Sequence, residues 1–128
     1  MWTFRTYVGP TGVEAVKDWY ARQSAKVQAG FDNRVANLRQ MRPEEWRAPY
    51  SKQLDGECDG LVELRFKADR VQRRPLGFFG PQRMEFTLLF FAIEKDGTFV
   101  PRDACQQALR RRDVVLFDPD ASAVFDVE

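Results

Sequence analysis

The chain has 128 residues, of which 44% are hydrophobic and 30% are charged, and its formal net charge of +1 fits a single globular domain. It contains no histidine, which excludes the commonest zinc ligand and the usual general base near neutral pH. No apolar run approaches the roughly 18 residues of a membrane span, and the N-terminus lacks the layout of a signal peptide, so we expect a cytoplasmic protein that binds no membrane.

The first part of the sequence predicts one strand followed by two helices. Residues 2–8 alternate in side-chain class and are followed by a Gly-Pro pair, which is typical of a strand. Beyond this pair the apolar residues take helical spacing. The second helical stripe has offsets of four, four and three residues and comprises Val27, Phe31, Val35 and Leu38. No apolar residue continues the pattern at 23–24, which favours a helical hairpin over one long helix.

Two strands are predicted in the middle of the chain. In residues 61–67 the apolar side chains alternate with Glu63, Arg65 and Lys67, which we expect on a solvent face. Residues 70–79 form a weaker strand, because their proline removes a hydrogen-bond donor. Such a strand is expected at the edge of a sheet or at a bulge.

The last regular elements are a buried strand and a helix. Residues 85–95 are almost continuously apolar and predict the central strand, whereas residues 101–112 fit a short helix. The element order predicts an α+β fold over residues 1–112. We expect a small antiparallel sheet of about four strands packed on the N-terminal helical hairpin, plus the C-terminal helix.

Residues 113–128 contain five of the acidic residues and neither lysine nor arginine, so the rest of the chain is basic. We interpret this segment as an acidic tail, in which 114–117 either adds a last strand or docks on the core. One hypothesis is that the tail folds over the basic residues of the chain, anchored by Val124 and Phe125, and competes with the phosphates of a bound polyanion. The alternative is a disordered, solubilising tail.

The two cysteines, Cys58 and Cys105, lie far apart in the sequence and outside any CxxC pair. Because the chain has no export signal, we expect both to be reduced thiols. The carboxylates show no clustered ligand spacing either. We therefore expect neither a metal ion nor another cofactor, and a metal-dependent nuclease is the least favoured enzyme class.

A dense group of basic residues begins within the first of the middle strands and continues beyond it, with a single acid among them. It comprises Arg65, Lys67, Arg70, Arg73, Arg74 and Arg83. Clustered cations gain affinity for nucleic acid by releasing condensed counterions from the phosphates. The group therefore indicates a polyanionic partner, and the alternative is a solvated strand face.

Four segments, GLVELRF, RRPLGFF, EFTLLFFAIEK and PRDACQQA, resemble the RelE/HigB toxin superfamily in this order, and most of all its phage-protein branch. The resemblance covers about residues 2–112 and is strongest from Gly60 to Lys95. It implies a small antiparallel sheet that carries two packed helices. It also implies a ribosome-dependent endoribonuclease that cuts messenger RNA, with a helix-turn-helix antitoxin as its partner.

The resemblance assigns family positions to Arg65, Arg74 and Lys95, and with Lys67 they are expected to surround the scissile phosphate. In such enzymes the ribose 2′-hydroxyl attacks the adjacent phosphorus, and cations stabilise the developing charge. Lys67 or Lys95 can act as the base only with a depressed pKa, which neighbouring arginines favour. The flanking RNA backbone is expected to contact Arg70, Arg73, Arg83 and Arg102.

Two other functions stay open, because the chain lacks the histidines and the C-terminal tyrosine that relatives use, and has Arg73 at a position that is often aromatic. The first is a ParE-like inhibitor of DNA gyrase, which needs no nuclease centre. The second is a phage-derived interaction module that keeps the fold without toxicity.

Overall fold

The computed structural model describes residues 1–125, which form three α-helices and eight strands. The helices are α1 (Ala15–Ala21), α2 (Ala25–Arg39) and α3 (Ala104–Phe117). The strands are β1 (Thr3–Tyr7), β2 (Ser51–Gln53), β3 (Val62–Leu64), β4 (Phe66–Ala68), β5 (Val71–Phe79), β6 (Glu85–Lys95), β7 (Thr98–Val100) and β8 (Ser122–Val124). Within this part of the chain, no helix combines the length and the apolar character that crossing a bilayer requires.

The strands form one mixed sheet in the order β2-β3-β5-β6-β1-β8, with β4 also pairing with β5 and β7 with β6. β1 runs parallel to β6, whereas the other pairs are antiparallel. The prediction of an antiparallel sheet of about four strands is therefore wrong. Five of the strands have only three residues each. β2, β7 and β8 are too short for an alternating pattern to be recognised in the sequence, and the single strand predicted over residues 61–67 is divided into β3 and β4.

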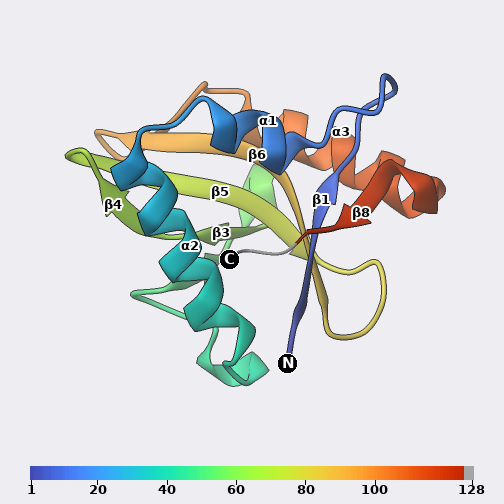
Figure 1. Cartoon of the computed structure of the whole chain (residues 1–128), viewed down its shortest axis with the longest axis horizontal. Helices are drawn as coiled ribbons and strands as arrows, with labels where there is room; N and C mark the ends of the chain where they lie inside the picture. Colours follow the sequence, from blue (N-terminus) through green and yellow to red (C-terminus); the bar gives the residue numbers. More distant parts are fainter. Residues whose placement is uncertain (126–128) are drawn as a thin grey trace.

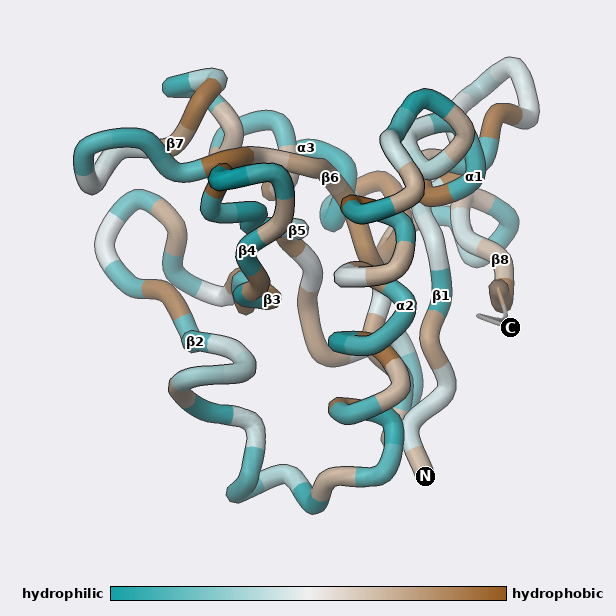
Figure 2. The backbone as a smooth tube through the Cα atoms, turned by 60° about the vertical axis from the view of Figure 1, so that its left-hand side comes forward, coloured by the Kyte–Doolittle hydropathy of each residue, from teal (hydrophilic) through white to brown (hydrophobic). Residues whose placement is uncertain are grey.

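The predicted helical hairpin is also wrong as an arrangement. Figure 1 shows α1 crossing one end of the sheet, while α2 runs along its side at a steep angle to α1. α1 lies over β1 and β6, whereas α2 packs against β4. The four residues of the predicted stripe are all buried in α2, which confirms that helix. Hydrophobic and hydrophilic residues accordingly alternate around α2 in Figure 2.

The long strands lie at the centre of the sheet. β6 is flanked by β5 and β1, which confirms the prediction of a central buried strand. β5 is also internal, and its register shifts between Leu76 and Gly77, so the predicted bulge is present and the edge position is not. A Cβ atom at Gly77 would collide with the Thr87 carbonyl oxygen of β6. The bulge therefore brings two backbones so close that only glycine fits.

Hydrophobic clusters cover both faces of the sheet. One cluster joins the α2 stripe to Phe4 and Leu64, and the other joins α3 to Leu76. Glu63 lies opposite Leu76 in the β3–β5 pair and therefore shares the face that α3 covers. It is 4% exposed, so the prediction of a solvent face for this part of the sequence is wrong at Glu63.

The cysteines form a disulfide, Cys58–Cys105, which overturns the expectation of reduced thiols. Cys58 ends a short 3₁₀ turn before β3, and Cys105 is the second residue of α3. Because α3 packs over this end of the sheet, the two residues meet although 47 positions separate them. The sequence spacing carries no sign of this approach, which depends on the tertiary fold.

The acidic segment is structured up to Phe125, the last residue that the structure describes. Residues 114–117 belong to α3 and Val115 is buried, so of the two predicted alternatives this segment docks on the core and does not add a strand. β8 follows and pairs with the edge of β1, beside which it lies in Figure 1. Phe125 packs against Phe4 and Phe31, whereas Val124 is exposed. Asp126 and Glu128, which belong to the predicted tail, lie outside the described residues.

Candidate functional site

A pocket of about 520 Å³ opens at the sheet edge where β2 begins beside the end of β3. It receives side chains from α2, β4, β5 and β6, and from the segment that precedes β2. Its lining comprises Arg34, Ala48, Pro49, Arg65, Phe66, Lys67, Gln72, Arg74 and Glu94. Four cationic side chains thus converge with one carboxylate, and we call this the cation pocket.

A tight turn joins β4 to β5 and so positions the two strands that line part of the cation pocket. Asp69 and Arg70, between the two strands, both have left-handed backbone angles, with φ of 52° and 63°. A two-residue turn of this kind matches the twist of an antiparallel hairpin. The resulting register sets Lys67 directly opposite Gln72, so both side chains reach the same side of the hairpin.

The N-terminus of α2 is attached to the same turn. Ser24 caps α2, and its hydroxyl donates a hydrogen bond to the Asp69 carboxylate at 2.6 Å. Further along the helix, an ideal Cβ atom on Gly30 would lie 2.8 Å from Phe66 Cδ2 in β4. The absence of a side chain at Gly30 therefore allows α2 to approach β4 closely. One turn later, Arg34 reaches the cation pocket.

Arg74 is held at the back of the cation pocket and is 3% exposed. Its Nε donates to Glu94 Oε1 at 3.1 Å and lies 3.4 Å from Glu63 Oε2. Its Nη1 donates to the Arg73 carbonyl at 2.9 Å, and its Nη2 donates to Gln72 Oε1 at 3.4 Å. Two carboxylates and two neutral acceptors thus satisfy this guanidinium, which positions the other groups of the pocket.

Arg65 shares one of these carboxylates. Its Nε lies 3.0 Å from Glu63 Oε2, and 31% of its side chain is exposed. Burial raises the pKa of Glu63, while the positive charges of Arg74 and Arg65 oppose this rise. Arg65 therefore has one edge bound to Glu63 and another edge open to the cation pocket.

Arg34 and Lys67 have no carboxylate partner among the described residues. The Arg34 guanidinium lies 4.9 Å from the centre of the Tyr50 ring, and its Nε and Nη1 are buried without a hydrogen-bond partner. Burial lowers the pKa of Arg34, an effect that Tyr50 partly opposes. Lys67 is exposed at the mouth of the pocket. Two of the four cations thus remain available for an anion.

The structure brings together only part of the predicted site. Arg65, Lys67 and Arg74 line the cation pocket, and Lys95 does not. The Arg73 Nη2 donates to the Ala68 carbonyl at 3.5 Å. Three further predicted residues are exposed outside the pocket lining, namely Arg70, Arg83 and Arg102. Arg83 lies between β5 and β6, at the opposite end of β5 from the pocket.

Sequence reasoning missed Arg34, Gln72 and Glu94 as members of the site. Arg34 lies within the apolar stripe of a helix. A charged residue in such a position is usually expected to point to solvent beside the stripe and not into a functional site. Glu94 joins the site through its ion pair with Arg74. Comparison of the chain with protein-family profiles, curated proteins and solved structures finds no match.

Protonation of Glu63 is expected to strengthen anion binding in the cation pocket. As the pH falls toward its raised pKa, Glu63 gains a proton and no longer offsets the charges of Arg65 and Arg74. Oligothymidylate, which does not titrate in this range, is therefore expected to bind about fivefold more tightly at pH 5 than at pH 7. Fluorescence anisotropy at constant ionic strength measures this ratio.

Glu63→Gln serves as the control for this pH effect, since it removes the titrating carboxylate and retains the side-chain shape. The variant is expected to bind oligothymidylate with little change between the two pH values. An equal pH response in Glu63→Gln and in the unmodified protein would assign the effect to another titrating group.

Proposed function

We propose that the chain is a toxin of the RelE/HigB type, which binds messenger RNA in the cation pocket and cleaves it on the ribosome. The observation that carries the proposal is the convergence of four cations, two of which lack a carboxylate partner among the described residues. A bound phosphodiester supplies the missing negative charge. Because the pocket lies at an open edge of the sheet, single-stranded RNA can pass through it without any unfolding of the protein.

The groups of the cation pocket suit metal-independent cleavage of RNA. In this reaction the ribose 2′-oxygen bonds to the adjacent phosphorus, and the bond from phosphorus to the 5′-oxygen breaks. In the proposed reaction the Glu94 carboxylate accepts the 2′-hydroxyl proton, and the Lys67 ammonium protonates the leaving 5′-oxygen. Arg34 and Arg65 stabilise the charge that develops on the phosphoryl oxygens.

A second candidate function is RNA binding without cleavage, and the state of Arg74 favours it. The family position is occupied by an arginine whose donors already contact Glu94, Gln72 and a backbone carbonyl. Such an arginine orients its neighbours and contributes little direct contact with a phosphate. The two candidates share the binding site and differ in whether the message is cut.

The proposal places the protein in the cytoplasm, with ribosome-bound message as its substrate and a helix-turn-helix antitoxin as its control partner. Cytosolic thiol pools keep most cysteine pairs reduced. The Cys58–Cys105 bond therefore makes it necessary to assay the protein in both redox states.

Replacing Arg34 and Lys67 together by alanine is expected to weaken binding of single-stranded RNA. Each lost phosphate contact lowers the slope of log K against log salt by about 0.7, so the slope falls by about 1.4. The affinity at physiological salt is expected to fall about 10- to 100-fold. In cells, the double variant is expected to lose growth arrest and the cleavage ends that the unmodified protein leaves on ribosome-bound message.

The matched control is Arg83→Ala with Arg102→Ala, which removes the same charge from exposed positions outside the pocket lining. Retained cleavage and affinity in this control support the cation pocket. Loss of RNA affinity in both double variants to the same extent would mean that total charge, and not this pocket, binds the message. Growth arrest with DNA-damage signalling and an intact message would instead support a gyrase inhibitor.

A further inference from the structure

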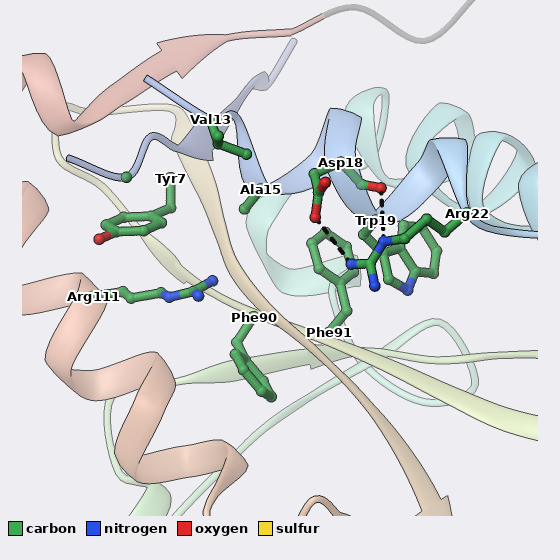
Figure 3. Close-up of a pocket in the computed structure, with 10 residues that line it drawn as sticks. Tyr7, Val13, Ala15, Asp18, Trp19, Arg22, Phe90, Phe91 and Arg111 are labelled. Atoms are coloured by element: carbon green, nitrogen blue, oxygen red, sulfur yellow. Dashed lines mark hydrogen bonds and ion pairs between the residues drawn. The ribbon is translucent and has the colours of Figure 1, made fainter. Parts of the chain in front are cut away.

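A second cavity lies at a gap in the pairing of β6, away from the cation pocket. β1 pairs with β6 as far as Leu88, and β7 pairs with it again from Ile93. Among the described residues, no strand pairs with this edge of β6 between the two positions. A cavity of about 280 Å³ opens there, bounded by α1 and α3 (Figure 3). It shares no lining residue with the cation pocket.

Arg111 of α3 extends into this cavity, as Figure 3 shows. Its Nη1 donates to the Leu89 carbonyl at 2.8 Å, on the unpaired edge of β6. Its Cζ lies 4.7 Å from the centre of the Tyr7 ring and 5.4 Å from that of Phe90. The two rings and the carbonyl hold the guanidinium in one orientation, and its remaining donors are left for another acceptor.

No carboxylate of the described residues neutralises Arg111. The acidic residue on the cavity wall is Asp18 of α1, and its carboxylate pairs with Arg22 at 3.0 Å, as the dashed line in Figure 3 shows. Partial burial lowers the pKa of Arg111, a sign that the guanidinium has lost hydration without gaining a full counter-charge. The cavity therefore holds a positively charged group that lacks an anion.

Aromatic side chains form the opposite wall. Trp19 stacks on Phe91 with ring centres 4.3 Å apart and an interplanar angle of 7°. Neither ring is fully buried, although both are large apolar groups. Flat rings that stay partly open to a cavity offer a surface for a further planar, apolar group.

We propose that this cavity binds a small aromatic carboxylate, whose carboxylate group pairs with Arg111 and whose ring packs against Phe91 and Trp19. A guanidinium binds a carboxylate through two parallel hydrogen bonds, which matches one arginine to one acid group. The volume admits about one ring system and excludes a drug-sized ligand. β1 and β7 close the two ends of the gap, which excludes an extended peptide strand.

Titration of the full chain with phenylacetate, and with phenylacetamide as its uncharged counterpart, tests the proposal. Protein-observed NMR follows the Trp19 indole N–H together with the backbone amides. The acid is expected to bind about tenfold more tightly than the amide or better, because only the acid forms the charged pair. Equal affinities, or shifts confined to residues outside the cavity, would overturn the proposal.

Two variants separate binding from folding. Arg111→Met is expected to bind the acid and the amide equally, whereas Arg110→Met, an exposed change on the same helix, is expected to keep the preference for the acid. Because Arg111 also packs between two rings, Ala15→Phe provides an independent test, since it fills the cavity and leaves Arg111 in place. Retained acid binding in Ala15→Phe, with an unchanged circular dichroism spectrum, would exclude this cavity as the site.

Discussion

Arg74→Ala is expected to lower the free energy of unfolding by about 3 to 5 kcal/mol, the cost of breaking a buried ion pair by removing one of its members. Arg74 is 3% exposed, and its removal leaves Glu63 buried beside the single charge of Arg65. The main expected effect of Arg74→Ala is therefore on folding stability, and its expected effect on the proposed RNA contact is secondary. Urea unfolding at pH 7, followed by fluorescence, measures it from the shift of the midpoint at constant slope.

Two further variants distinguish the loss of the buried Arg74–Glu63 ion pair from the general effect of removing a positive charge. Arg83→Ala removes an exposed arginine and is expected to change the stability by less than about 0.5 kcal/mol. Arg74→Met with Glu63→Leu removes both buried charges and is expected to recover part of the loss, because no unpaired ion is left in the interior. A double variant as unstable as Arg74→Ala would show that packing volume, and not charge pairing, determines the effect.

Replacing Cys58 and Cys105 together by serine is expected to lower the free energy of unfolding by about 4 kcal/mol. The bond closes a loop across a sequence separation of 47 residues, and a cross-link over that length removes unfolded-state entropy of this size. Calorimetry or urea unfolding under oxidising conditions measures the difference. The effect is comparable to the whole stability of a marginal domain.

The cysteine prediction has an internal control. A reducing agent is expected to destabilise the unmodified protein by a similar amount and to leave the Cys58→Ser, Cys105→Ser double variant unchanged. Equal stability with and without reductant would mean that the bond contributes nothing under these conditions. RNA cleavage measured on the same samples shows whether the fold that supports the cation pocket survives in a reducing compartment.

These stability effects bear on how the proposed function is tested. An inactive Arg74 variant does not distinguish lost catalysis from lost folding, because Arg74 holds Glu94 and Gln72 in place. Arg34 and Lys67 make no ion pair among the described residues, so their replacement tests binding with less effect on the fold. The most informative comparison is therefore between the Arg34 and Lys67 double variant and Arg74→Ala.

Part of the fold follows from local patterns. The stripe that begins at Val27 is buried along α2, and the apolar run of residues 85–95 is β6. Both elements are long enough for helical or strand periodicity to be recognised. The three-residue strands, by contrast, form only where a neighbouring strand offers them an edge to hydrogen-bond with, so the size of the sheet and its parallel β1–β6 pair could not be predicted.

The candidate site divides in the same way. Lys67 and Arg74 come from the two strands of the β4–β5 hairpin, and Arg65 directly precedes β4, so their proximity follows from the sequence order. Arg34 joins them because Gly30 lets α2 approach Phe66. No pattern along the chain predicts this contact, which depends on packing between a helix and a strand distant in sequence.

The amino-acid sequence by itself determined where the main helices and long strands form and that cations are concentrated around β4 and β5. Only the tertiary structure decided which of these cations are free. Because α3 covers the face that carries Glu63, this carboxylate is buried and must pair with Arg65 and Arg74. The net charge of a sequence is the sum of its charged residues. Whether one of these charges is available to a ligand depends instead on its burial and on the nearest opposite charge, and the folded chain alone sets both.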